Sequence, residues 1–365
     1  MDGTPYVTQC PILPASRFVY KFRARTTGTM FYHSHTSFQR GDGAFGPYIV
    51  RRTAEKEPQA ELYDFDLTEH LIFPQEWFHS ASREAFVLHH WDTGKNKPDN
   101  MLINGKGRNR NGTQTPYATF HVRSGFRYRF RVVSPGFTLC PVEVSVENHK
   151  LTLIASDTHA IQPIEVDSFV VHEGERFDFV LNANQKSGVY QMKFGGLFDC
   201  AKPKIHGLGL LIYDNVQNEM DAAFMDRQTD YENFVNIEGK VVNPLNFAPP
   251  KIPLARMPRI DEKHQKIPIS ELKHLPSPRL NDSKFFYLHS NLIHRLTFQN
   301  SGYAGKSLKE KPDKTFYLAY DLLPKTNPDF FSKEYYTFDQ VEGQNKLRTP
   351  QLNNISLLVR VSFFN

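Results

Sequence analysis

Several features that identify a function class directly are absent from this 365-residue sequence. It has three cysteines, and none of them belongs to a CxxC pair, which excludes a local zinc knuckle and a thioredoxin-type motif. No apolar run approaches the roughly 18 residues of a membrane-spanning helix. A net charge of +5, from 44 basic and 39 acidic residues, is too small for a nucleic-acid-binding surface, so no nucleic-acid partner is expected.

The N-terminal residues also lack the features of a signal peptide, because they are not basic and no apolar run follows them. Three glycosylation sequons nevertheless occur, and such sites are used only in the secretory pathway. They begin at Asn111, Asn281 and Asn354. Sequons are common by chance, so by themselves they favour a secreted protein only weakly.

Aromatic residues and proline are plentiful, with 30 Phe, 16 Tyr and 24 Pro. This composition favours many short strands joined by turns over long helices, and we predict an all-β fold. The length suits two or three domains. Alternating apolar residues predict individual strands, most clearly at residues 18–23, 47–51, 128–132, 142–146, 151–154, 177–181 and 208–213.

Changes in composition divide the chain into four parts. A charged stretch, residues 51–61, separates a first β-rich segment, residues 1–52, from the most regular one, residues 60–214. Residues 215–280 contain a polar stretch and a region rich in Pro, Lys and His, and we predict a linker or crossover there. Residues 281–365 again contain strand-like pieces and form the third β-rich segment.

Two histidines one residue apart, His33 and His35, are the strongest candidate site. On a strand from Met30 to His35 they would share a face, with backbone positions roughly 6 to 7 Å apart. This spacing lets the two imidazoles share one metal ion or bind one each of two adjacent ions. Imidazole suits zinc, copper and iron alike, so the pair does not select the metal. An isolated HxH is more often a pair of partly exposed or hydrogen-bonded histidines.

The wider sequence around the pair, GTMFYHSHTSFQRGDGAFGPYIV, resembles the second copper-ligand motif of the multicopper oxidases, the laccase-like family. Arthropod laccases are especially similar. Residues 1–12 resemble the stretch that follows the family's first ligand motif, and residues 148–185 resemble its second cupredoxin domain. The resemblance thus covers three separated places within about the first 215 residues.

This resemblance implies tandem cupredoxin-like Greek-key β-sandwiches, of which the first and third are incomplete. Residues 1–52 would be the C-terminal part of the first cupredoxin domain, and residues 60–214 the second domain. Residues 281–365 would be the N-terminal part of the third domain. Met1 matches an internal methionine of the family, so we expect the chain to lack both ends of the parent protein.

In such a protein, His33 and His35 are each a ligand of one copper ion of the binuclear (type 3) pair in the oxygen-reducing trinuclear cluster. Asp42, in the matching GDG, would deliver protons to reduced oxygen, since the charge of nearby metal ions readily sets the pKa of an acid. The alternative for Asp42 is an ordinary turn residue between two glycines.

The resemblance also implies a disulfide between Cys10 and Cys140 that joins the first domain to the second, which favours an oxidising, extracellular compartment. Two unpaired buried thiols are the alternative. Cys200 has no evident partner, and is either free or paired with a residue outside this sequence.

The sequence departs from the family pattern at the other copper sites. A complete enzyme has further histidine motifs and a cysteine flanked by histidines, which forms the blue copper site that takes electrons from the substrate. No cysteine in this chain has a histidine neighbour, and HxH occurs once. We therefore expect this chain alone to be inactive.

Our leading interpretation is a fragment of a laccase-like multicopper oxidase, whose parent couples one-electron oxidation of diphenols, aromatic amines or ferrous ion to the reduction of O2 to water. A non-catalytic binding or structural protein derived from cupredoxins is the second hypothesis, and it predicts a stable chain that holds no copper. A zinc site that combines His33 and His35 with a third ligand is the third hypothesis, and the sequence shows no matching partner.

Overall fold

The computed structural model describes residues 9–36, 38–85, 97–107, 115–214 and 230–243, and beyond these only the backbone of six short strands. The chain divides into two compact units, Met1–Ala85 with Lys97–Leu275, and Phe86–Asn96 with Pro276–Asn365. Several predicted features lie outside the described residues: the sequons at Asn111, Asn281 and Asn354 and most of the linker at 215–280. The boundaries of the predicted domains stay predictions.

The alternating stretches of the sequence form strands in the first unit. Six predicted strands are confirmed, and they are β2 (Phe45–Val50), β7 (Arg127–Val133), β8 (Val142–Val146), β9 (Leu151–Ser156), β12 (Arg176–Asn182) and β14 (His206–Tyr213). Helix is almost absent from the described residues, so the all-β prediction is also confirmed. The single-turn 3-10 helices are η1 (Ala54–Lys56), η2 (Ala60–Leu62), η3 (Thr68–His70), η4 (Phe198–Cys200) and η5 (Tyr231–Asn233).

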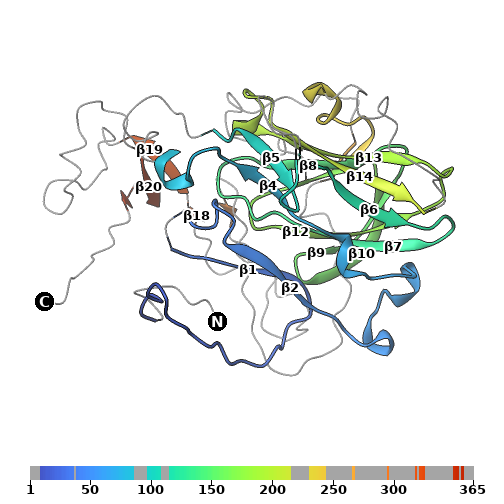
Figure 1. Cartoon of the computed structure of the whole chain (residues 1–365), viewed down its shortest axis with the longest axis horizontal. Helices are drawn as coiled ribbons and strands as arrows, with labels where there is room; N and C mark the ends of the chain where they lie inside the picture. The colour runs from blue at the N-terminus through green and yellow to red at the C-terminus, as the bar shows by residue number, and fades with distance from the viewer. Residues whose placement is uncertain are drawn as a thin grey trace, which may run out of the picture. The chain divides into compact units, whose positions relative to one another are not determined.

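Two sheets form the body of this unit, and both use strands that are distant in sequence. The remaining strands of the two sheets are β3 (Leu71–Ile72), β6 (Ala118–Val122), β10 (His159–Val166), β11 (Ser168–Val171), β13 (Val189–Gly196), β15 (Lys240–Val242) and β16 (Gln265–Ile267). The five-stranded sheet has the order β10-β9-β12-β7-β3, and the seven-stranded sheet has the order β16-β15-β11-β8-β13-β14-β6. In Figure 1 the strands β7, β9, β10 and β12 lie together beneath β6, β8, β13 and β14.

The core lies between the two sheets and is built from large aromatic side chains. Phe130 on β7 and Phe179 on β12 stack with ring centroids 5.2 Å apart. Phe169 on β11 of the other sheet lies 5.9 Å from Phe179, so the aromatic contacts cross from sheet to sheet. All three side chains are fully buried, and side chains of this size contribute about 1.5–3 kcal/mol each through burial. The interleaved inner faces make this unit a β-sandwich.

A two-stranded hairpin precedes the sandwich and packs against it. It consists of β1 (Gly28–His33) and β2 (Phe45–Val50), which pair antiparallel from Gly28–Val50 to His33–Phe45. Three of its side chains, Phe31, Phe45 and Ile49, cover a small apolar cluster of the sandwich that consists of Leu71, Phe73 and Val133. The hairpin therefore obtains its apolar partners from the sandwich.

The strand predicted at residues 18–23 is wrong. These residues form no strand, and Phe18, Val19 and Phe22 are about half exposed, with exposed fractions of 49%, 63% and 57%. The alternation is present in the sequence, but a strand also needs a hydrogen-bonded neighbour. No described segment pairs with this one.

The predicted disulfide between Cys10 and Cys140 is also wrong, because the structure pairs Cys140 with Cys200. Strands β8 and β13 are antiparallel neighbours, and Val142 faces Gly196 at the end of their ladder. Two backbone hydrogen bonds continue the pairing beyond the strands, from Leu197 N–H to Pro141 O (2.7 Å) and from Asp199 N–H to Leu139 O (3.0 Å). They bring the two Cα atoms to 5.3 Å, a usual disulfide separation. Cys10 is a free, exposed thiol.

A second hairpin, β4 (Pro74–Trp77) with β5 (Asn100–Ile103), follows β3 and contacts β14 of the sandwich. It carries the buried carboxyl group of Glu76. The other compact unit contains the antiparallel pairs β17–β18, β19–β20 and β20–β21. Its strands are β17 (His294–Arg295), β18 (Tyr317–Leu318), β19 (Tyr320–Pro324), β20 (Arg348–Leu352) and β21 (Ile355–Ser356).

Candidate functional site

One face of β1 carries Thr29, Phe31 and His33, because side chains on a strand alternate between its two faces. Thr29 is fully buried among charged groups of the sandwich, and Phe31 packs on its apolar cluster. The His33 ring follows, with its centroid 5.0 Å from that of Phe31. The face of β1 that bears His33 is thus the face that is attached to the sandwich.

His33 and His35 lie side by side at the end of β1. The strand ends at His33, earlier than predicted, yet the two ring centroids are 6.0 Å apart with their planes tilted by 32°. The Nδ1 atom of His33 lies 3.0 Å from the carbonyl oxygen of Ser34. If that nitrogen carries the proton, it donates to Ser34 and Nε2 remains available for a metal ion. His33 is partly buried and His35 is exposed.

The loop that follows the histidines, residues 38–43, is fixed at both of its ends. The N–H of Ser34 donates to the carbonyl oxygen of Ala44 at 2.8 Å, which closes the loop beside the histidines. The backbone of Gly41 lies so close to the Phe137 ring and the Ser82 hydroxyl that a Cβ atom at this position would clash with both. Glycine is therefore required where the loop meets the sandwich.

Asp42 is exposed and accepts a hydrogen bond in this loop. Its Oδ1 atom accepts a hydrogen bond of 2.7 Å from the backbone N–H of Ser82, which lies in the connection between β4 and β5 of the second hairpin. Gln75 donates from its Nε2 to the carbonyl oxygen of the neighbouring Gly41 at 3.4 Å. The Asp42 carboxylate is therefore held by a hydrogen bond from outside the first β-rich segment. A residue that serves only to form the turn would not need this bond.

A buried network of charges fixes the other end of β1. The Thr29 hydroxyl donates to Asp178 Oδ1 (2.6 Å) and accepts from Arg131 Nη1 (2.7 Å). Asp178 also accepts from Arg131 (2.9 Å) and from Arg129 Nε (3.0 Å), and Arg131 donates to Asp66 at 2.9 Å. Burial is the largest single influence and opposes the charge of Arg129, but Asp178, Tyr63 and Asp66 together outweigh burial and raise the Arg129 pKa above its usual range. The sequence motif did not single out Thr29, although Thr29 and His33 share one face of β1.

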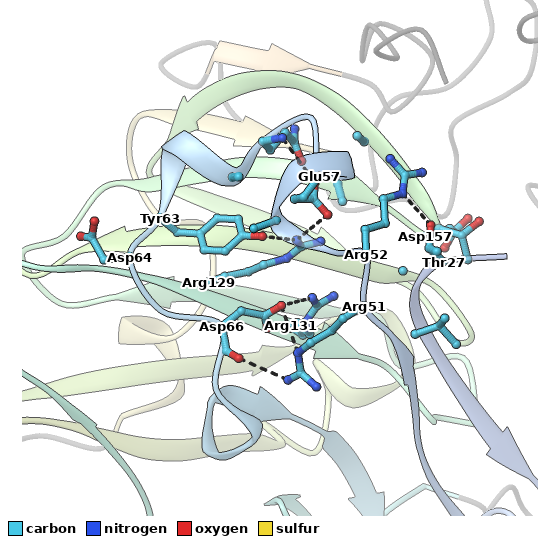
Figure 2. Close-up of a pocket in the computed structure, with 18 residues that line it drawn as sticks. Thr27, Arg51, Arg52, Glu57, Tyr63, Asp64, Asp66, Arg129, Arg131 and Asp157 are labelled. Atoms are coloured by element: carbon cyan, nitrogen blue, oxygen red, sulfur yellow. Dashed lines mark hydrogen bonds and ion pairs between the residues drawn. The ribbon is translucent and has the colours of Figure 1, made fainter. Parts of the chain in front are cut away.

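A cavity of about 290 Å³ lies beside this network, between the hairpin, the η1–η2 segment and the sandwich. Figure 2 shows Arg129 directed towards Tyr63 and Glu57, and Arg131 directed towards Asp66. Four arginines border the cavity opposite four acids, and they are Arg51, Arg52, Arg129 and Arg131 against Glu57, Asp64, Asp66 and Asp157. With formal charges that cancel, the cavity selects neither anions nor cations, and its arginines and acids connect the hairpin to the sandwich.

Comparison with known proteins assigns a family to this arrangement. Residues 68–215 match a family model described as multicopper oxidase, and residues 1–55 match a second model with the same description. The chain belongs to the multicopper oxidase family. The segment at residues 1–55 contains His33, His35 and Asp42, and the segment at residues 68–215 contains all strands of the sandwich except β15 and β16.

Similar multicopper oxidases include Laccase-2 of Pleurotus ostreatus, which is 38% identical over 53% of this chain and 34% of that protein. A laccase of Trametes maxima is also 38% identical, over 53% of this chain and 37% of that protein. A solved laccase structure from Botrytis aclada is 30% identical, with a TM-score of 0.50, over 60% of this chain and 41% of that chain. The chain therefore spans about a third of the length of these curated relatives. The arthropod likeness stays a prediction.

Copper is the cofactor of the multicopper oxidases, and the imidazole pair fits copper by its donor chemistry and spacing. Among the described residues, no group of three or more His, Cys, Asp or Glu side chains is placed to hold a metal ion. His33 and His35 thus fit as part of a ligand set. In the part of the chain that the structure describes, no helix is long and apolar enough to cross a membrane.

Proposed function

We propose that this chain is the part of a laccase-like multicopper oxidase that contributes His33 and His35 to a copper pair. The observation that carries the proposal is the placement of two imidazoles 6.0 Å apart at the end of a strand whose opposite end is fixed in the sandwich. The parent enzyme oxidises diphenols or aromatic amines by one electron each and reduces O2 to water. Ferrous ion is an alternative reductant.

The residues of this chain would bind, orient and move protons in that reaction. His33 and His35 would hold the copper ions, which supply the redox chemistry when bound. The carbonyl oxygen of Ser34 would orient the His33 ring by accepting a hydrogen bond from its Nδ1–H group. Asp42 would deliver protons to reduced oxygen, and its hydrogen bond from the Ser82 N–H would fix the direction of its carboxylate.

This chain alone would be inactive as an oxidase. None of its three cysteines has a histidine neighbour, so the chain lacks the cysteine-centred motif of the substrate-oxidising copper site. Secretion and glycosylation at Asn111, Asn281 and Asn354 are part of the same proposal. The disulfide between Cys140 and Cys200 supports them, because such bonds persist in oxidising compartments.

Copper binding tests the proposal. We expect the chain to retain copper after equilibrium dialysis, with the bound fraction reduced at least about tenfold in His33→Ala and in His35→Ala, because each variant removes one imidazole ligand. His79→Ala is the matched control, because His79 is an exposed histidine outside the pair.

Retention that is equal in all variants, or absent in the native chain, contradicts the assignment. A chain that is stable and copper-free favours the non-catalytic binding or structural protein. Retention of zinc in preference to copper favours the zinc site.

A further inference from the structure

Two acidic side chains, Glu76 and Glu173, are packed against the same glycine, Gly136. A Cβ atom built on Gly136 would lie 2.9 Å from Glu76 Oε1 and 3.1 Å from Glu173 Cγ. Glu76 is on β4 and is only 2% exposed, and Glu173 is in the turn between β11 and β12. Gly136 thus leaves room for the two acids to approach each other.

The environment of the pair favours a shared proton. Burial, followed by the nearby charge of Glu173, raises the pKa of Glu76 to about 7. Burial also raises the pKa of Glu173, against the hydrogen bond that it accepts from the Cys140 N–H at 2.6 Å. Two buried carboxyl groups within electrostatic reach of each other do not both ionise readily, so one proton stays with the pair near neutral pH.

The pair is connected to the loop that carries Asp42. Glu76 accepts from the Thr138 hydroxyl (2.8 Å) and from the Phe137 N–H (3.2 Å). The ring of Phe137 in turn covers the backbone of Gly41, the neighbour of Asp42. A displacement of the Glu76 carboxyl group therefore moves the side chain on which this loop rests.

Arg40, in the same loop, supplies the opposite charge. Burial lowers its pKa, while Glu76 and Glu173 raise it, so both acids lie within electrostatic reach. None of the ion pairs within 4.0 Å among the described residues joins Arg40 to Glu76 or Glu173. The other charged groups that face the pair are His172 and Glu175, both next to Glu173 in its turn.

We propose that Glu76 and Glu173 are positioning residues for Asp42. They share one proton while the loop at residues 38–43 is seated as observed, and when that proton leaves they draw in Arg40 and shift the loop. The inference rests on the proposed function, because Asp42 matters only as a proton donor to reduced oxygen. The position of the Asp42 carboxylate would then depend on the protonation of a buried acid pair, with Glu76 on the second hairpin and Glu173 on the sandwich.

Nuclear magnetic resonance of the Gly43 amide tests this directly. The sequence contains two Asp–Gly pairs, Asp2–Gly3 and Asp42–Gly43, so labelling Asp carbonyls with ¹³C and Gly nitrogens with ¹⁵N selects these two amides. We expect the Gly43 signal of the copper-free chain to titrate with a midpoint near pH 7, the value at which Glu76 ionises. The Gly3 signal is the internal reference.

Three variants and a control separate loop movement from other causes. Glu76→Gln and Glu173→Gln keep the shape of the protonated acid, and we expect the Gly43 titration to be lost in the first and moved to lower pH in the second. In Arg40→Gln we expect less than about half of the pH-dependent change in the Gly43 signal, because the loop movement needs Arg40. A direct electrostatic effect of the two acids on the Gly43 amide would persist in full without Arg40. Glu84→Gln, at an exposed acid, leaves the titration unchanged.

A Gly43 signal that does not titrate between roughly pH 5 and pH 9, or that titrates equally in Glu76→Gln, overturns the inference. A full shift in Arg40→Gln overturns the movement of the loop. Because the measurement uses the copper-free chain, failure of copper binding would leave its result standing. If the chain binds copper through His33 and His35 but its Gly43 signal does not titrate in the copper-free state, the inference fails and the proposed function stands.

Discussion

Thr29 shows how one hydroxyl group connects two parts of this molecule. It donates to Asp178 and accepts from Arg131, and all three side chains are at most 2% exposed. A buried charge that loses a hydrogen-bond partner retains the cost of its lost hydration. The position of β1, and with it that of His33, therefore depends on a group that bears no charge itself.

Removal of that hydroxyl tests this dependence. Thr29→Val keeps the shape of the side chain, and we expect the free energy of unfolding to fall by about 1–3 kcal/mol, because Asp178 and Arg131 each lose a bond. Urea denaturation followed by circular dichroism measures the change. Thr119→Val, on the exposed face of β6, should stay within about 0.5 kcal/mol of the native protein. Equal losses in both variants would contradict the role of Thr29.

Glu76 makes a pH-dependent contribution to stability. Its pKa rises from 4.5 when unfolded to about 7 when folded, so the folded state binds the proton more tightly. The stabilisation by that proton is complete below pH 4.5 and is lost as the pH rises to about 7, by about 3 kcal/mol in total. Denaturation of the native chain and of Glu76→Gln across this range should show a smaller decline in the variant. Parallel curves would exclude a raised pKa.

At the scale of elements, the ladder between β8 and β13 decides the disulfide. These strands pair from Met192–Val146 to Gly196–Val142, and the cysteines lie just beyond the end of the pairing. Cys10 belongs to a segment without a strand partner among the described residues, so no ladder brings it to Cys140. Cysteine spacing in a sequence does not report which strands are neighbours.

Peptide mapping of the unreduced protein tests the pairing. We expect proteolysis to yield a peptide that links Cys140 to Cys200, and iodoacetamide to alkylate Cys10 in the folded chain because that thiol is exposed. Reduction should lower stability by about 2–4 kcal/mol, since the bond closes a sequence separation of 60 residues. A peptide that links Cys10 to Cys140 would restore the pairing implied by the family.

At the scale of the whole molecule, the sandwich and the hairpin of β1 and β2 in the first unit differ in the interactions that stabilise them. The sandwich has its own aromatic core, while the hairpin of β1 and β2 covers only a small apolar cluster and relies on buried charges. A buried ionic network gives little net stability, but it is costly to break and fixes geometry. The candidate site thus consists of ligands on the hairpin whose position is set by the sandwich.

The sequence by itself determined five strands of the sandwich, one strand of the first hairpin and the two histidines. Alternation in β7, β8, β9, β12 and β14 needs no distant partner to be recognised, because inward and outward side chains already differ in polarity. The spacing of His33 and His35 follows from local backbone geometry, and the family motif was visible around them. These are properties of consecutive residues.

Only the tertiary structure decided what distant residues do to one another. It left residues 18–23 without a strand, paired Cys140 with Cys200, and brought Glu76 against Glu173, which are 97 positions apart by their numbers. A glutamate in the apolar stretch LIFPQEWF was the one local signal for the acid pair. Hydrogen-bond partners and buried charges depend on which strands become neighbours, and that is settled by packing of the whole sandwich.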